Sequence, residues 1–133
     1  MSAAGVVTVE SAYTAGETLA RLQSALQAAG MTVFAIFDHA DAASKAGLSL
    51  RPTTVVVFGN PAAGTKLMQS NQTAGLDLPL KILVWEDESK TAKLTYNDVA
   101  WLAARHELGP ETAPVIAAMT KLLASLAQKA AKG

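Results

Sequence analysis

The sequence predicts an α+β domain in which a mostly antiparallel sheet packs against helices. Apolar runs rich in β-branched residues alternate with segments of helical spacing, and residues 80–96 read as two strands joined by the polar turn at 87–90. A turn of that length makes neighbouring strands antiparallel, whereas parallel strands need a crossover of a dozen or more residues. We therefore expect helices on one face of an antiparallel sheet, and not a doubly wound parallel sheet.

The first part of the chain is expected to form a strand, a helix and a second strand. A strand of about residues 5–13 precedes a helix that begins at the N-cap Thr14 and ends at Gly30. Residues 31–39 form the second strand, and residues 41–46 form a short helical turn.

The third strand, residues 53–58, leads directly into a helix. Its apolar residues do not alternate with polar ones, so we expect both faces to be covered and the strand to be internal. Asn60 is the predicted N-cap and Pro61 the first helical residue, where its missing N–H is not needed. This helix runs to about Ser70.

The last part of the chain reads as a hairpin followed by two helices. Pro79 opens the fourth strand, as proline is tolerated at the beginning of a strand. Asn97 is expected to cap a short helix that continues through His106. An amphipathic helix begins at about Glu111.

Leu83 and Trp85 alternate with Leu80, Ile82 and Val84 along the fourth strand, so the two sets lie on opposite faces. If the helices cover one face, Leu83 and Trp85 lie on the uncovered one, and exposed apolar residues on a sheet suggest a partner surface. We prefer a homodimer. The alternative is ordinary burial of both residues under the C-terminal helix.

The composition favours one domain that spans residues 1–133. Eleven basic residues balance eleven acidic ones, so we expect no nucleic-acid partner. The absence of cysteine excludes disulfides and thiolate chemistry. No apolar run approaches the roughly 20 residues that span a bilayer, and the N-terminus has no signal-like segment. We expect a cytoplasmic protein that makes no membrane contact.

Residues 59–66 carry the spacing of a phosphate-binding loop but not its chemistry. They read G-x-x-x-x-G-T-K, whereas the phosphate loop ends in G-K-[ST], and Pro61 removes a backbone donor. A looser anion site at the helix N-terminus would use Asn60 with Thr65 or Lys66. The alternative is a simple turn between strand and helix.

His39 is the main candidate for chemistry. It could act as a general base, or as a metal or haem ligand with Met68 as a soft partner, but a histidine with a purely structural role at a strand end is more common. Arg51 is a second candidate anion contact. We predict no metal site, because no histidine pair or second carboxylate stands at ligand spacing.

Several longer stretches resemble the bacterial and archaeal family called domain of unknown function 302. They are Glu17-Thr-Leu-Ala-Arg-Leu22, Val33-Phe-Ala-Ile-Phe-Asp-His39, Gly47-Leu-Ser-Leu-Arg-Pro-Thr53, Phe58-Gly-Asn-Pro61, Gly64-Thr-Lys-Leu-Met68, Gly75-Leu-Asp-Leu-Pro-Leu80, Trp85-Glu86 and Thr95-Tyr96-Asn97. The resemblance implies a β-α-β(4)-α arrangement similar to the TATA-box-binding-protein-like folds, and a homodimer. It implies no established activity.

Three functions therefore remain open, and no cofactor is identified. The first is a homodimeric module that binds a small molecule or an anion near the Gly59-Asn60-Pro61 turn. The second is a structural or interaction protein that acts through its dimer surface, and the third is an enzyme that uses His39. The candidate ligand-binding residues are His39, Arg51, Asn60, Thr65, Lys66 and Met68.

Overall fold

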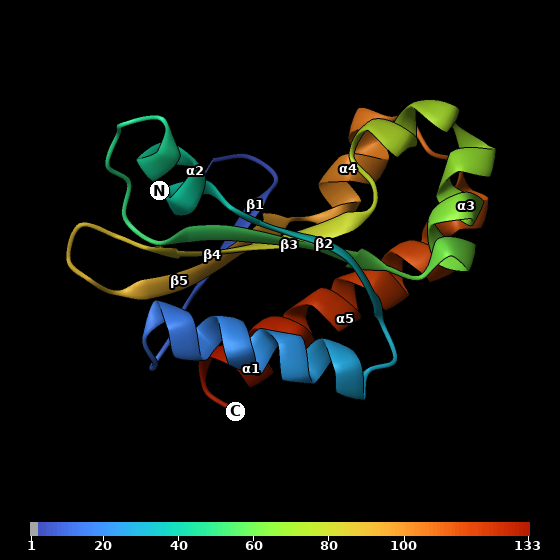
Figure 1. Ribbon diagram of the computed structural model, residues 1–133. Helices are drawn as coiled ribbons and strands as arrows, with labels where there is room; N and C mark the ends of the chain where they lie inside the picture. Colours follow the sequence, from blue (N-terminus) through green and yellow to red (C-terminus); the bar gives the residue numbers. More distant parts are fainter. Residues whose placement is uncertain (1–2) are drawn as a thin grey trace.

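Five strands form one antiparallel sheet in the order β1-β5-β4-β3-β2 (Figure 1). The structure is a computed structural model and describes residues 3–133. The strands are β1 (Val6–Glu10), β2 (Thr32–Asp38), β3 (Thr53–Gly59), β4 (Leu80–Glu86) and β5 (Ala92–Asn97). The predicted α+β class is confirmed, and β3 is an internal strand as expected.

Two long helices cover one face of this sheet. They are α1 (Ala15–Ala28) and α5 (Ala113–Ala131). The shorter helices are α2 (His39–Lys45), α3 (Pro61–Ser70) and α4 (Val99–Arg105), with the 3₁₀ turns η1 (Gln72–Leu76) and η2 (Pro110–Thr112). In Figure 1, α1 and α5 lie below the sheet and α2 lies above it. α3 and α4 lie at the end of the sheet that is opposite the β4–β5 hairpin. The expectation that helices cover one face is therefore met by α1 and α5, but not by α2.

The core fills the space between the sheet and the two long helices. Ile82 and Val84 of β4 and Phe58 of β3 are fully or almost fully buried there, together with Leu22 and Leu26 of α1. The period-two pattern of β4 sends Leu80, Ile82 and Val84 to this face and Leu83 and Trp85 to the other. Both faces of β3 were expected to be covered, but only its helix side is fully buried.

Side-chain caps explain where several elements begin. The predicted cap of α1 is confirmed, since the Thr14 hydroxyl accepts the Glu17 N–H at 3.1 Å. Asp38 caps α2 in the same way, because its carboxylate accepts the N–H of Asp41 at 2.9 Å. This cap makes His39 the first residue of α2, so the prediction that His39 ends a strand was wrong.

Three predicted boundaries near other element ends also need correction. β1 ends at Glu10 and does not continue to residue 13. Asn97 belongs to β5 and pairs with Val6, and the cap of α4 is Asp98, whose carboxylate accepts the Ala100 N–H at 3.0 Å. The last helix begins at Ala113, because the residues before it form the turn η2.

Candidate functional site

The turn from β3 into α3 forms as predicted. β3 ends at Gly59, the Asn60 carboxamide oxygen accepts the Ala62 N–H at 3.0 Å, and Pro61 is the first residue of α3. Proline fits that position because its fixed φ suits the helix. The turn places α3 at the end of the sheet, where it contacts the helix α5 (Figure 1).

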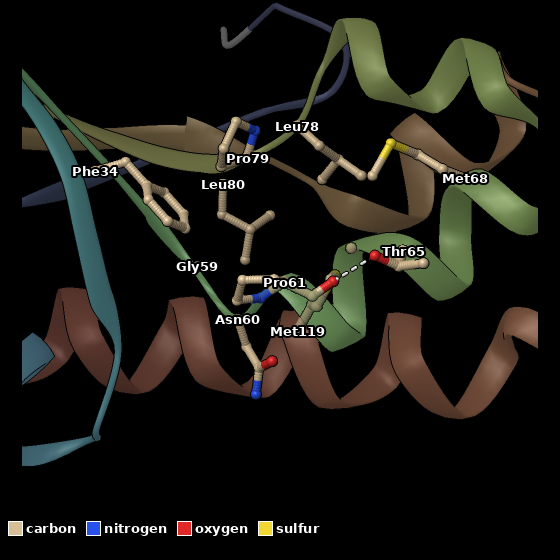
Figure 2. Close-up of a pocket in the computed structure, with 11 residues that line it drawn as sticks. Phe34, Gly59, Asn60, Pro61, Thr65, Met68, Leu78, Pro79, Leu80 and Met119 are labelled. Atoms are coloured by element: carbon tan, nitrogen blue, oxygen red, sulfur yellow. Dashed lines mark hydrogen bonds between the residues drawn. The ribbon is translucent and has the colours of Figure 1, made fainter.

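A cavity of about 230 Å³ lies beside this turn, and we call it the α3 cavity. Its large apolar side chains come from five elements or their flanks: Phe34, Met68, Leu78, Leu80 and Met119. Figure 2 shows Phe34 on one side of the cavity and Met68 with Leu78 on the other. Pro61, Pro79 and two glycines complete the apolar lining.

Asn60 and Thr65 supply the only polar side chains among the residues that line the α3 cavity. The Thr65 hydroxyl donates to the Pro61 carbonyl at 2.7 Å, so it remains an acceptor. The Asn60 oxygen is occupied by its capping bond, which leaves the two amide hydrogens of the same side chain as donors. The cavity is therefore apolar with a small hydrogen-bonding edge.

A second cavity of about 390 Å³ lies next to the first, and we call it the Lys66 cavity. The two share Gly59, Asn60, Leu80 and Met119 as lining residues. Lys66 brings the only charged side chain among the residues that line the Lys66 cavity. The sequence candidates Asn60, Thr65, Lys66 and Met68 therefore lie around two adjoining cavities.

The N-terminus of α3 has few backbone donors left for an anion. Pro61 has no N–H, and the N–H of Ala62 bonds the Asn60 side chain. The N–H groups of Ala63 and Gly64 both bond the Asn60 carbonyl, at 3.1 and 3.2 Å. Since anion sites at helix ends depend on unpaired N–H groups, this geometry favours an uncharged ligand.

His39 and Arg51 do not join this site. β2 pairs with β3 from Thr32 opposite Gly59 to Asp38 opposite Thr54, so His39 and Asn60 lie at opposite ends of the sheet. At about 3.3 Å per residue, the separation along β3 is roughly 17 Å. Arg51 also lies at the far end, where its Nε donates to the Glu86 carbonyl at 3.2 Å.

The surroundings of His39 do not match those of a general base. Its ring is exposed and stands edge-on to Phe37, with 4.9 Å between the ring centroids. Asp38 uses its carboxylate to cap α2, so it is not aligned to orient the imidazole. In residues 3–133, no three His, Cys, Asp or Glu side chains come close enough together to hold a metal ion.

A polar cluster missed by the sequence analysis links η1 to the end of α4. The carboxylate of Asp77 accepts hydrogen bonds from Arg105 at 2.9 and 3.1 Å and is hydrogen-bonded to Nε2 of His106. Nδ1 of His106 is 3.0 Å from the Thr73 hydroxyl, and Asn71 donates to the His106 carbonyl at 2.7 Å. Because His106 is buried, these bonds hold residues 71–77 against the end of α4. This segment leads directly into Leu78, which lines the α3 cavity.

Leu83 and Trp85 lie on the sheet face opposite α1 and α5, as expected. Both are half-buried, and the Trp85 indole donates to the Thr95 hydroxyl at 2.8 Å while the Lys93 ammonium lies 5.4 Å from its ring centre. Neighbouring side chains thus already cover part of Trp85. More apolar surface is exposed along β2 than at these two residues.

Comparison with solved structures identifies the same architecture in another protein. An uncharacterized conserved DUF302 protein from Bacillus stearothermophilus superposes with a TM-score of 0.84, over 96% of this chain and 99% of that one. The sequence identity is 23%, so this likeness concerns the fold.

Curated relatives come from Brucella. Proteins named fluoride-specific ion channel FluC 1 in Brucella suis and in Brucella abortus are each 50% identical over 115 residues, or 86% of this chain. The match covers 45% and 43% of those proteins, so the chain spans less than half of their length. Within residues 3–133, none of the helices has both the length and the apolar character to cross a membrane.

The last comparison is with protein families. The profile of the family described as "Domain of unknown function DUF302" matches residues 7–126, which is nearly the whole chain. The resemblance seen in the motifs, the shared architecture and this match agree: the chain belongs to the DUF302 family.

Proposed function

We propose that this chain binds a small, mainly apolar molecule in the α3 cavity. The observation that carries the proposal is a cavity of about 230 Å³ whose lining is apolar except for Asn60 and Thr65. Ligand sites commonly combine apolar walls with a few placed polar groups. An apolar cavity of roughly 150 Å³ holds benzene, so a ligand somewhat larger than benzene fits here.

The available polar atoms define one end of this ligand. The Thr65 hydroxyl points toward the cavity and can accept a hydrogen bond, whereas the Asn60 amide points away from it beyond Pro61 (Figure 2). A hydroxyl group on the ligand would therefore find a partner at Thr65. A carboxylate or phosphate would find few donors, since the first N–H groups of α3 are already bonded. The preferred class is therefore a neutral, aromatic or aliphatic alcohol.

Gly64 allows this proposal to be tested inside the cavity. A Cβ added at Gly64 meets Leu78 and Met68 at 3.9 and 4.0 Å, which is ordinary van der Waals contact. Gly64→Ala therefore narrows the cavity without a clash, and Gly64→Leu fills it. Gly16→Ala is the control, because a Cβ at Gly16 meets nothing within 4 Å and lies on α1.

The measurement is an amide NMR titration with toluene, benzyl alcohol and benzoate, which share a ring and differ in their polar group. We expect benzyl alcohol to bind most tightly and benzoate least, with shifts confined to residues around the α3 cavity. Binding should weaken in Gly64→Ala, disappear in Gly64→Leu and persist in Gly16→Ala. Equal binding by the wild type and Gly64→Leu would refute the proposal, and preference for benzoate would support an anion site instead.

We also propose that the protein works as a homodimer in the cytoplasm. Support for self-association comes from the formal net charge of zero and from the exposed apolar residues of the sheet. Leu83 and Trp85 are the interface candidates that the sequence suggests. A dimer that acts only as an interaction module would keep its assembly but bind none of the three aromatic probes.

A second candidate function follows from the Brucella relatives. Since half of the aligned residues are identical to a part of proteins named fluoride-specific ion channels, this chain is a candidate accessory domain in fluoride handling. Lys66 is the cation in the neighbouring cavity that could attract a halide. Fluoride, but not chloride, should then shift the amide signals around Lys66, and Lys66→Met should abolish the shift. Identical spectra with both salts would eliminate this candidate.

A further inference from the structure

A third cavity lies on the sheet face that α1 and α5 leave uncovered, and we call it the open-face cavity. It measures about 420 Å³. Leu83 and Trp85 of β4 line its base, and Leu50, in the connection between α2 and β3, also lines it with 49% of its surface exposed. In Figure 1 this is the upper face of the sheet, on which α2 also lies. The open-face cavity therefore offers an apolar surface to a ligand outside the core.

Arg51 lines the same cavity and keeps donors that the fold does not use. Its Nε donates to the Glu86 carbonyl at 3.2 Å, which holds one edge of the guanidinium against the end of β4. Among residues 3–133, neither terminal nitrogen of Arg51 takes part in a hydrogen bond or an ion pair. The N–H groups on these nitrogens form the planar fork that suits a carboxylate. Arg51 can therefore bind a carboxylate while its Nε bond keeps it in place.

Two threonine hydroxyls that line the cavity also leave one hydrogen without a partner. The Thr95 hydroxyl accepts the Trp85 indole N–H at 2.8 Å and lies 2.9 Å from the Thr8 hydroxyl. Only one of the two hydroxyls can donate in the contact between them, so the other keeps its hydrogen. No acceptor for that hydrogen lies in the part of the chain that the structure describes. The cavity therefore has unused donors in two places, and an oxygen acceptor complements each of them.

The pairing of the strands sets the distance between these two groups of donors. Arg51 bonds Glu86 at the end of β4, and Thr95 pairs with Leu83, three residues earlier on the same strand. At about 3.3 Å per residue, the separation is roughly 10 Å. Trp85 lies between the two groups along β4. A ligand that reaches both groups of donors is therefore an extended molecule that crosses the indole.

The charges near the open-face cavity leave its Arg51 end positive. Glu86 borders the cavity, but the alternation along β4 places its side chain on the helix-covered face of the sheet. The Asp87 carboxylate is paired with the Lys93 ammonium at 3.0 Å. Glu10 lies opposite Lys93 on β1 and does not line the cavity. An anion at Arg51 therefore meets no unpaired carboxylate among the residues that line the cavity on this face.

We propose that the open-face cavity binds a small apolar carboxylate with an oxygen acceptor at its far end. The carboxylate pairs with Arg51, and the apolar body lies on Leu83 and Trp85. The far acceptor takes the free hydroxyl hydrogen of Thr8 or Thr95. An apolar cavity of roughly 150 Å³ holds benzene, so about 420 Å³ leaves room for two fused rings.

This site is separate from the α3 cavity and does not depend on the function proposed above. Thr53 lines the open-face cavity and Gly59 lines the α3 cavity, and the two stand six positions apart on β3, which is roughly 20 Å. The ligand preferences are also opposite. The α3 cavity is short of free donors and favours a neutral alcohol, whereas the open-face cavity has free donors and a cation. Binding at the two sites can therefore be measured independently.

The indole N–H signal of Trp85 is the direct probe of this site. The chain has two tryptophans, so its amide NMR spectrum holds two indole signals, and Trp101→Phe assigns them. The titrants are 6-methoxy-2-naphthoate, 2-naphthoate and 2-naphthamide, which share two fused rings. We expect all three to shift the Trp85 signal, with a Kd for 2-naphthoate at least tenfold below that for 2-naphthamide. The methoxy compound should bind most tightly.

Two substitutions separate the charge from the apolar surface. Arg51→Gln should raise the Kd of both naphthoates at least tenfold and leave that of 2-naphthamide within twofold, because it removes the charge. Leu50→Ala should weaken the binding of all three probes alike. Lys121→Gln is the matched control, since it removes one positive charge from the exposed side of α5 and should change none of the Kd values. None of the three variants should alter benzyl alcohol binding in the α3 cavity.

The outcomes distinguish the parts of this proposal. Equal Kd values for 2-naphthoate and 2-naphthamide in the wild type, or equal weakening by Arg51→Gln and Lys121→Gln, would overturn the carboxylate site at Arg51. Equal Kd values for the two naphthoates would overturn the threonine contact. A Trp85 signal that moves when the protein alone is diluted, but with none of the probes, would overturn the whole proposal and assign this face to a second copy of the chain.

Discussion

Gly5 precedes β1 and has no room for a larger side chain. Its φ of +76° lies in the left-handed region, and a Cβ added there would stand 2.3 Å from the Trp101 ring. Gly16 differs in both respects, since its backbone is helical and a Cβ would meet nothing within 4 Å. An alanine at position 5 therefore meets both an unfavourable φ and a steric clash. An alanine at position 16 meets neither, so it reports only the preference of helices for alanine over glycine.

We expect Gly5→Ala to lower the free energy of unfolding by more than about 1 kcal/mol, because the substitution combines an unfavourable φ with a ring contact. Gly16→Ala should leave stability unchanged or raise it by roughly 0.5–1 kcal/mol. Urea unfolding of both variants measures the difference. An equal effect of the two substitutions would contradict the described conformation of Gly5.

Asp77 is expected to contribute much more to stability than Asp41, although each carboxylate has an ion pair at 2.9 Å. Asp77 is hydrogen-bonded to the buried His106, whereas Asp41 pairs with Lys45 on an exposed surface of α2. Asp77→Ala should cost roughly 1–3 kcal/mol, because it leaves a buried polar group without its partner. Asp41→Ala should cost only a few tenths through the lost ion pair. Similar losses in urea unfolding would show that the Asp77 cluster is not needed to hold the fold.

The hairpin between β4 and β5 is organised by one carboxylate. Asp87 accepts the N–H groups of Ser89 and Thr91, each at 2.9 Å, and its second oxygen lies 3.0 Å from the Lys93 ammonium. The Thr91 bond and then the Lys93 contact hold the pKa of Asp87 below its ordinary value of 3.8. The charged carboxylate therefore favours the folded state of this hairpin.

This pKa predicts the pH dependence of the Asp87→Asn variant. Because the folded pKa is lowered, the stabilisation is complete above the ordinary pKa of 3.8 and is lost as the pH falls through the folded value. Asp87→Asn should melt at a lower temperature than the wild type at neutral pH, and the gap should close in strong acid. A gap that stays constant across the acid range would contradict the assigned role.

Caps and alternation made several elements predictable from local sequence. Asn60 and Pro61 specify the beginning of α3 within three residues, and Leu80, Ile82 and Val84 specify the buried face of β4 by spacing alone. His39 was misplaced because no loop separates the strand from the helix. Asp38 both ends β2 and caps α2, so the sequence carries no separate signal for the boundary.

The candidate site was less predictable because it depends on how elements pack. Motifs pointed to Met68 and Asn60 as candidates, but Phe34 and Met119 reach the α3 cavity from β2 and α5, far away in the sequence. Asp77 and His106 are likewise separated by 29 positions, and no local pattern joins them. The wide separation of His39 from Asn60 also became clear only from the pairing of β2 with β3.

At the scale of the whole molecule, a ligand that binds only the folded protein must raise the free energy of unfolding of that protein. At a concentration 100 times its Kd, the expected gain is about 2.7 kcal/mol. Benzyl alcohol near saturation should therefore raise the melting temperature of the wild type by several degrees relative to Gly64→Leu. Equal shifts in both proteins would indicate a solvent effect and not occupation of the α3 cavity.

The most direct test of the central claim is a crystal structure of the protein grown with 4-bromobenzyl alcohol, whose bromine is located by anomalous scattering. We predict the bromine between Phe34 and Met68, with the hydroxyl directed to Thr65. A bromine found only outside the α3 cavity, or a cavity that stays empty at saturating ligand, would contradict the proposal that this DUF302 protein binds small apolar molecules at the β3–α3 turn.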